Sequence, residues 1–212
     1  KSSTLAAAGT EIKNKVLTDV IDGSAKTVVS AGFKNADALS ALSKVTQKSV
    51  EALSSAGFDS VAASAASATV VGASITKAVS SGISKAADTS SVASAMGAAA
   101  GAGAAKANIT VDAKEMLKQV SAAAKAVGVT SEQTSAVLNS AISGTATGAA
   151  IAGGTGATKL LDNLKAAVAK ADTFSGLGVT IDANSLAGSL SQAVTSATNL
   201  AKTVNSGGMA KC

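Results

Sequence analysis

The stretch SSAGFDSV at residues 54–61 decides the fold, because it repeats an earlier phrase and marks a boundary between two segments. The letters SAGF occupy residues 30–33 and return at residues 55–58, twenty-five residues later. Glycines continue at the same step in two series, Gly32, Gly57 and Gly82, then Gly103, Gly128, Gly153 and Gly178. Self-similarity at a fixed period of this size indicates repeated supersecondary units.

The residues after these glycines indicate what each boundary does. Gly32, Gly57, Gly128 and Gly178 are each followed by an apolar residue and then by Asn, Asp or Thr. Gly can take the left-handed conformation that ends a helix, and the apolar residue can fold back as in a Schellman motif. We therefore interpret SAGF as a helix-to-helix turn rather than a binding loop, with Phe33 and Phe58 as plugs on their turns. The N-caps expected for the helices that follow are Asn35, Asp59, Thr130 and Asp182.

The segments between the glycines are Ala-rich and place their apolar residues at helical spacing. In residues 36–55, for example, Leu39, Leu42, Val45 and Leu53 share one side of a helix. Short turns between helices of similar length favour antiparallel neighbours. The sequence thus predicts an all-α fold, an antiparallel array or bundle of seven to eight helices with tight Gly turns and an approximate 25-residue repeat. Residues 1–206 form one helical repeat domain, and residues 207–212 form a flexible C-terminal tail.

The composition excludes much chemistry. Hydrophobic residues make up 47% of the 212, aromatic residues only 1%, and His, Trp, Tyr and Pro are absent. All eighteen basic residues are Lys. Without His there is no imidazole base and no His metal ligand, and without Arg there is no bidentate anion clamp. We expect no catalytic, cofactor-binding or metal site, no small-molecule substrate and no enzymatic activity; Asp112, Glu115 and Asp182 are explained as residues at helix starts.

The net charge of +5 raises the question of nucleic acid, which the charge pattern answers in the negative. The lysines are scattered singly among thirteen acidic residues rather than gathered in a stripe, and aromatic side chains for base stacking are nearly absent. We expect the partner of this chain to be another copy of itself, in a homo-oligomer or polymer.

Two segments carry almost no charge, residues 89–105 and residues 133–158, and small residues recur in them at every fourth position. Such a face lets a neighbouring helix approach closely. The candidate helix-packing and assembly residues are Gly97, Gly101, Gly144, Gly148, Ala152 and Gly156. Three interpretations remain open: a buried central helix, a contact surface between subunits, and membrane insertion, against which the high Ser, Thr, Gly and Asn content of the second segment argues.

The C-terminal sequence NSGGMAKC ends in the single cysteine, Cys212, a candidate for an intermolecular disulfide or a free thiol. The start, KSSTLAAAGTEIK, resembles the beginning of a mature chain whose export signal has been removed. Together with a composition of small residues and Lys, this predicts a secreted, extracellular protein.

Three functions compete at this point. The first is an exported, non-enzymatic structural protein that assembles through its small-residue helix faces into filaments, fibres or a lattice. The second is an ice-binding protein, because Thr134 and Thr145, and also Thr147 and Thr158, are eleven residues apart and lie on one helix face. The third is a membrane-active or surface-active helical protein whose bundle opens to expose Ala-rich faces.

Overall fold

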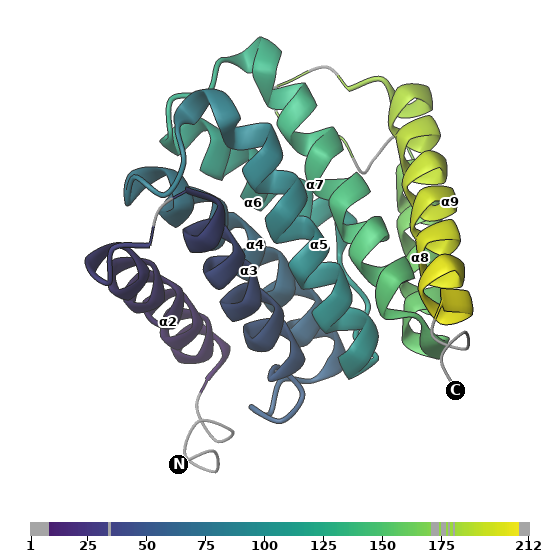
Figure 1. The fold of residues 1–212 in the computed structure, drawn as a ribbon, viewed down its shortest axis with the longest axis horizontal. Helices are drawn as coiled ribbons and strands as arrows, with labels where there is room; N and C mark the ends of the chain where they lie inside the picture. The colour runs from purple at the N-terminus through teal and green to yellow at the C-terminus, as the bar shows by residue number, and fades with distance from the viewer. Residues whose placement is uncertain are drawn as a thin grey trace.

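A computed structural model describes residues 9–33, 35–170, 174, 177, 179 and 181–207, with side chains to residue 199. All regular structure in these residues is helical, which confirms the all-α prediction and the expected number of helices. The eight α-helices are α2 (Thr10–Ser30), α3 (Asn35–Glu51), α4 (Ser60–Ser80), α5 (Thr89–Ala107), α6 (Ala113–Ala126), α7 (Ser131–Ala152), α8 (Gly154–Val168) and α9 (Ala183–Gly207) (Figure 1). A short 3₁₀ helix, η1 (Ala86–Asp88), precedes α5.

Three of the predicted glycine turns have the expected geometry. Gly32, Gly57 and Gly128 have φ values of 77°, 78° and 82°, the left-handed conformation that glycine adopts at little cost. The amide of the residue after each glycine donates to a carbonyl five residues back, as in Phe58 to Leu53 at 3.2 Å. This is the long bond of a Schellman motif, so SAGF is a helix stop.

Side-chain caps begin the next helices, as the sequence predicts. Asp59 accepts a hydrogen bond from the Ala62 amide at 2.8 Å, and Thr130 forms a reciprocal capping box with Gln133. Asp182 accepts from the Asn184 amide at 2.9 Å, just before α9. Asn35 differs from the prediction, because it is the first residue of α3 and has a φ of 41°, a conformation that Asn tolerates better than most residues.

Gly103 is not a turn, contrary to the series predicted from the sequence. It lies inside α5, where an added Cβ would come within 2.6 Å of the carbonyl oxygen of Gln47 in α3. The end of α5 is made instead by Asn108, which has a φ of 55°, and the Ile109 amide donates back to Ala104 at 2.8 Å. Gly178 lies outside the described residues.

Phe33 and Phe58 differ as plugs, although both occupy the same place in SAGF. Phe58 is buried, and the Nζ of Lys13 lies 5.3 Å from the centre of its ring. The same ammonium donates to the Gly57 carbonyl at 2.7 Å, so Lys13, itself buried, ties α2 to the turn between α3 and α4. Phe33, in contrast, is half-exposed.

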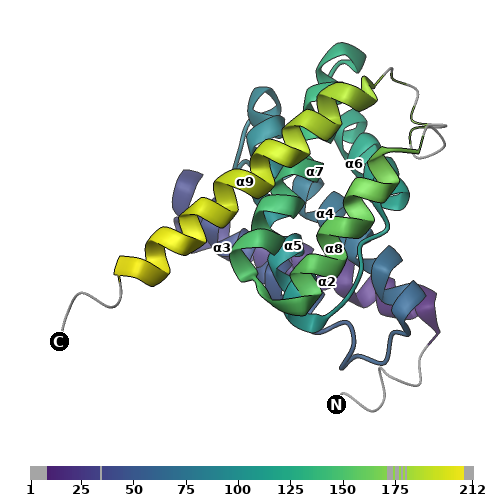
Figure 2. The ribbon, with the colours of Figure 1, turned by 90° about the vertical axis from the view of Figure 1, so that its right-hand side faces the viewer.

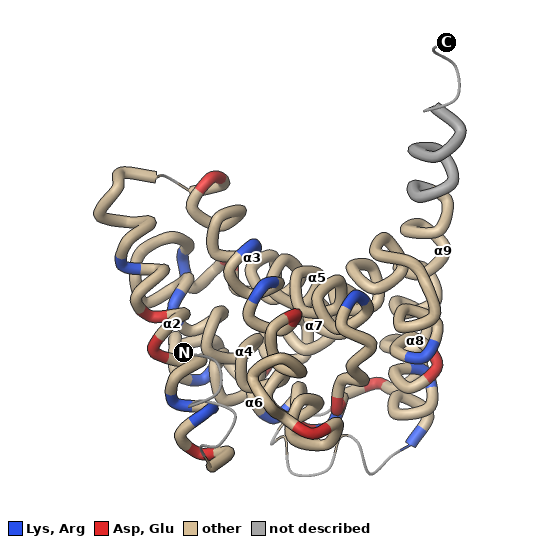
Figure 3. Tube along the Cα trace, turned by 90° about the horizontal axis from the view of Figure 1, so that it is seen from below, with Lys and Arg blue, Asp and Glu red and all other residues tan. Residues whose placement is uncertain are grey.

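The helices form two layers in which each helix packs on the next but one. One layer contains α2, α4 and α6, the other contains α3, α5, α7 and α9, and α8 packs mainly on α5 and α7; the most extensive contact is between α5 and α7 (Figure 1). The pair α2 and α3 lies at one end of the molecule and the pair α8 and α9 at the other, and Figure 3 shows the layers curving between them. Figure 2 views the α9 end, where this helix crosses obliquely over its neighbours.

The tightest pair of helices, α5 and α7, runs parallel, and these two helices are not consecutive in the chain. Cβ atoms added to Gly144, Gly148 and Gly156 would meet the backbones of Ser94, Ala98 and Ala105. The numbers rise together from Ser94 and Gly144 to Ala98 and Gly148, so α5 and α7 run in the same direction. Short turns make consecutive helices neighbours, but here the closest packing joins every second helix.

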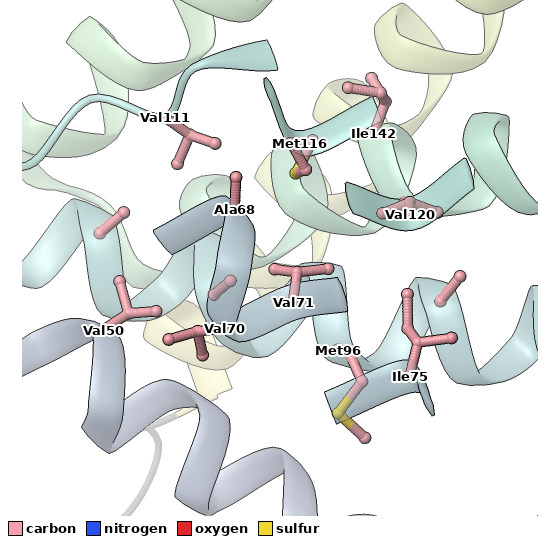
Figure 4. Close-up of a cluster of buried hydrophobic side chains, with 14 of the residues drawn as sticks. Val50, Ala68, Val70, Val71, Ile75, Met96, Val111, Met116, Val120 and Ile142 are labelled. Atoms are coloured by element: carbon pink, nitrogen blue, oxygen red, sulfur yellow. The ribbon is translucent and has the colours of Figure 1, made fainter. Parts of the chain in front are cut away.

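The core is filled by many small side chains around a few larger ones. Figure 4 shows Ile75, Met96, Met116 and Ile142 among valines and alanines from α3 to α7, all inaccessible to solvent. Each Ala contributes little apolar area, so close approach of the helix backbones must supply the packing contacts. The core therefore depends on where glycine and alanine allow helices to touch.

Candidate functional site

The glycines proposed as assembly residues are buried within the fold. We call Gly97, Gly101, Gly144, Gly148 and Gly156 the glycine seam, because all five are buried between α5 and the α7–α8 segment. An added Cβ on Gly97 would meet the Ala141 carbonyl oxygen, and one on Gly101 would meet that of Thr145. No side chain larger than hydrogen fits at these positions without moving backbone.

This placement corrects the assembly role given to the seam. A surface already covered by a neighbouring helix of the same chain is not open to a second copy, so the seam is a helix-packing feature. Ala152, at the end of α7, is partly buried and packs against the core. Cys212 lies outside the described residues, as do residues 208–211 of the predicted tail.

The threonines that suggested an ice-binding face do not form one. Thr134 and Thr145 are completely buried, and their hydroxyls donate to the carbonyls of Thr130 and Ala141 in the preceding turn, both at 2.8 Å. A buried hydroxyl cannot meet ice. Of the second pair, Thr147 is half-buried and Thr158 alone is exposed, so no regular ladder reaches the surface.

An apolar hollow lies between α2 and α3. It has a volume of about 530 Å³ and is lined by Val16, Leu17, Val20, Ser24, Lys44, Val45, Lys48, Ser49, Ala52 and Ala56. We call it the α2–α3 groove. Its lining has two charged groups, both lysines from α3, and the rest of its walls are aliphatic or small polar side chains.

An exposed apolar stripe runs along α2 at the edge of this groove. Ile12, Val16 and Val20 are 59%, 37% and 48% exposed, and their spacing of four residues places them on one side of the helix. We call them the α2 stripe. The opposite side of α2 is apolar too, since Leu17, Ile21 and further residues are buried in the core. This helix therefore has two apolar sides, of which the fold covers one.

Charged groups border the stripe and the groove on both sides. Lys15 and Asp19 form an exposed ion pair at 2.9 Å on α2, and exposed pairs of this kind contribute little to stability. On α3, Lys48 pairs with Glu51, and this hydrogen bond is the main cause that lowers the pKa of the Glu51 carboxyl. Charged residues of both signs therefore lie on α2 and α3 beside the apolar surface; Figure 3 marks the charged positions along the chain.

A second hollow, of about 340 Å³, lies on the other layer, against α2, α4 and α6. Its three threonines, Thr18, Thr69 and Thr76, all donate to carbonyls four residues back in their own helices. Nearby, Asp22 pairs with Lys26 and with Lys77, both at 2.7 Å. Hydrogen bonds from Lys26 first, and then from Lys77, lower the pKa of Asp22 from 3.8 to about 2. These polar groups are occupied with one another, so the hollow presents few free donors to a ligand.

The rest of the described surface offers little for catalysis or metal binding. No group of three or more acidic, Cys or His side chains that could hold a metal is found among the described residues. One described helix, α4, is long and apolar enough to cross a membrane by length and composition, but 61% of the relevant window is buried within the fold. A core helix passes the same test, and α4 contacts α2, α3, α5 and α6.

Sequence reasoning missed the α2 stripe, although a signal was present. Residues 12, 16 and 20 are apolar, and so are residues 17, 21, 25 and 28, which gives α2 two apolar sides instead of one. Comparison with protein-family models, with curated proteins and with solved structures found no match for this chain. The functional argument therefore depends on the surface of the molecule alone.

Proposed function

We propose that this protein is a non-enzymatic structural protein that assembles with copies of itself, and that it does so through the α2 stripe and the α2–α3 groove. The observation that carries the proposal is the exposure of Ile12, Val16 and Val20 beside an apolar groove of about 530 Å³. Contiguous exposed apolar surface of this kind is typical of interaction sites. The glycine seam, which first suggested assembly, has the different task of holding α5 and α7 together.

The proposal includes a repeated unit of two helices and about fifty residues, twice the step seen in the sequence. Thr46 donates to the sulfur of Met96 at 3.3 Å, and the seam pairs Ser94 with Gly144 and Ala98 with Gly148. In each pair the two residues are fifty positions apart. The helices α2 and α4 are both 21 residues long and start fifty residues apart. On this basis the fold is an open-ended helical stack of antiparallel pairs.

In an open-ended stack, an apolar end surface favours association with another copy of the chain. In stacked repeats each unit contacts its neighbours only, and terminal units need a polar outer face if the protein is to stay apart from other copies. The α2 stripe instead gives the terminal unit an apolar outer face. Large residues of this kind gain about 25 cal/mol for each Å² that an assembly removes from water.

Extracellular localisation and covalent linkage through Cys212 complete the proposal. The composition of small residues with Lys supports the first, and the presence of a single cysteine among the 212 residues supports the second. The absence of His and Arg from all 212 residues supports a role without catalysis. The ice-binding alternative is not proposed, because two of the four threonines that motivated it, Thr134 and Thr145, are buried.

Sedimentation velocity over a range of concentrations, in a Cys212→Ser background, tests the proposed assembly. We expect the parent to form species larger than one chain and the double variant Val16→Glu with Val20→Glu to remain a single chain. A matched control is Val61→Glu, since Val61 is 79% exposed on α4 and does not line the groove. A parent that stays monomeric up to millimolar concentration contradicts the proposal, and so does a double variant that associates as strongly as the control. Electron microscopy of the associated fraction then distinguishes filaments from closed oligomers.

A further inference from the structure

We infer that the partner of the α2–α3 groove is the α8–α9 end of a second copy, so that chains join head to tail. This inference rests on the proposed function, since it names the surface that the stripe meets. Three observations support it: the equivalents of the stripe inside the fold, the direction of the internal stacking, and the uncharged end at α9.

The first observation is that the fold buries the residues equivalent to the stripe where it continues the stack. Ile12, Val16 and Val20 correspond, fifty residues on, to Ala62, Ala66 and Val70 of α4. Ala66 and Val70 are completely buried and Ala62 is partly buried against the core. The α2 stripe therefore occupies a surface that the next unit keeps covered.

The element that covers this surface in the second unit belongs to the first. Val70 of α4 and Val50 of α3 belong to one buried cluster (Figure 4), both are inaccessible to solvent, and α3 contacts both α4 and α5. Because α3 is the last helix of the unit before α4, the surface on α2 is built to receive the last helix of a preceding unit. In a second copy, that helix is α9.

The second observation concerns direction. Within the chain, α3, α5 and α7 stack in one sense: Thr46 lies against Met96 and Ser94 against Gly144, with numbers rising together. A copy added to the end in the same sense presents its α8–α9 pair to the groove. A contact between two different surfaces repeats without closing unless the rotation forms a ring, so it gives open filaments.

The third observation is the outer surface of α9. Residues 183–199 contain no charged side chain, and Figure 3 draws this part of α9 in tan, the colour of uncharged residues. Gly188 faces open space, with no heavy atom within 4 Å of an added Cβ. Residues 183–199 of α9 therefore bring no ion of their own into the groove, and burying an ion is costly. Small residues also allow the close approach seen in the glycine seam.

A mixing experiment tests the inference. One chain carries Val16→Glu and Val20→Glu at the α2 end, and the other carries Gly188→Glu and Gln192→Glu on the exposed side of α9, both in the Cys212→Ser background. We expect each variant alone to associate at least tenfold more weakly than the parent. The mixture should form a one-to-one heterodimer that grows no further, because one intact groove meets one intact α9 end. Circular dichroism confirms that each variant retains the helical fold.

The outcomes separate the inference from the proposed function. An α9 variant that still associates like the parent overturns the head-to-tail contact and leaves self-assembly through the groove standing. A mixture that stays monomeric while the parent associates overturns it as well. A parent that stays monomeric contradicts the proposed function itself.

Discussion

Replacement of Gly148 by Ala tests whether the glycine seam sets the distance between α5 and α7. An added Cβ at this position would overlap the carbonyl group and Cα of Ala98, which are backbone atoms and cannot rotate away. Real Cβ atoms do not occur at such separations, so the two helices must move apart. This movement loosens the whole seam, including the contact at Gly144 one turn earlier.

The magnitude follows from two opposing effects. Overpacking in a tight core costs about 1–3 kcal/mol, and a clash with backbone belongs at the upper end of that range. The higher helix propensity of Ala than of Gly raises the free energy of unfolding by about 1 kcal/mol. The net loss of unfolding free energy is therefore about 2 kcal/mol, and for a chain of this size this lowers the Tm by about 4–8 °C.

The matched control is Gly23→Ala in α2. Gly23 is also helical, but nothing lies within 4 Å of an added Cβ, so only the gain in helix propensity remains. We expect this variant to be more stable than the parent by about 0.5–1 kcal/mol. Urea unfolding followed by circular dichroism measures both. If Gly148→Ala is as stable as Gly23→Ala, the helices are not held in contact at this point and the account of the seam is refuted.

Three further predictions concern single side chains. Lys13→Met should lose about 1.5–3 kcal/mol of unfolding free energy, because a charged hydrogen bond to the Gly57 carbonyl is removed; equal stability in urea would contradict it. Since the folded pKa of Asp22 is lowered to about 2, its ion pairs stabilise the fold above pH 3.8, and this stabilisation is lost as the pH falls toward 2. Asp22→Asn should accordingly lower the Tm at neutral pH and match the parent near pH 2, whereas a gap that persists there would rule out this cause. Asn108→Gly should unfold at the same or a higher temperature, while Asn108→Ala, at a φ of 55°, should cost about 1 kcal/mol; the reverse order would contradict the turn assignment.

The turns and caps could be predicted from the sequence because their physics is local. A left-handed glycine, a returning apolar residue and a capping side chain all lie within a few positions of one another, as at Gly57 and Asp59. Gly103 shows where the same reasoning fails. It falls in step with the other glycines, but Ala104 follows it and no capping residue comes next. Its role depends on Gln47 of α3, more than fifty residues away, which no local pattern contains.

The order of packing was beyond prediction for a related reason. Short turns determine that consecutive helices are neighbours, yet they do not determine whether the tightest contacts form within a pair or between pairs. The glycines of α5 and α7 are compatible with either arrangement. Only the register, with Ser94 at Gly144 and Ala98 at Gly148, decides that these helices run parallel.

The candidate assembly surface could be found only with the fold in hand. Apolar residues at 12, 16 and 20 indicate a buried helix side in any helical chain, and their exposure depends on α2 being the end of a layer. A small-residue stripe does not distinguish a contact within a chain from a contact between chains, because both require the same residues. In this protein the small-residue stripe forms a helix contact within the chain.

The difference between α2 and α4 gives a physical reason to treat the end surface as intermolecular. At equivalent positions α4 has Ala62, Ala66 and Val70, whereas α2 has Ile12, Val16 and Val20. Two helices of one chain are held near each other by the turns between them, so small side chains suffice to close their contact. Two separate molecules must first overcome a loss of translational and rotational freedom of about 4–15 kcal/mol. At about 25 cal/mol per Å², larger side chains offer more energy at each position, and the change from Ala to Ile or Val occurs where the surface is open.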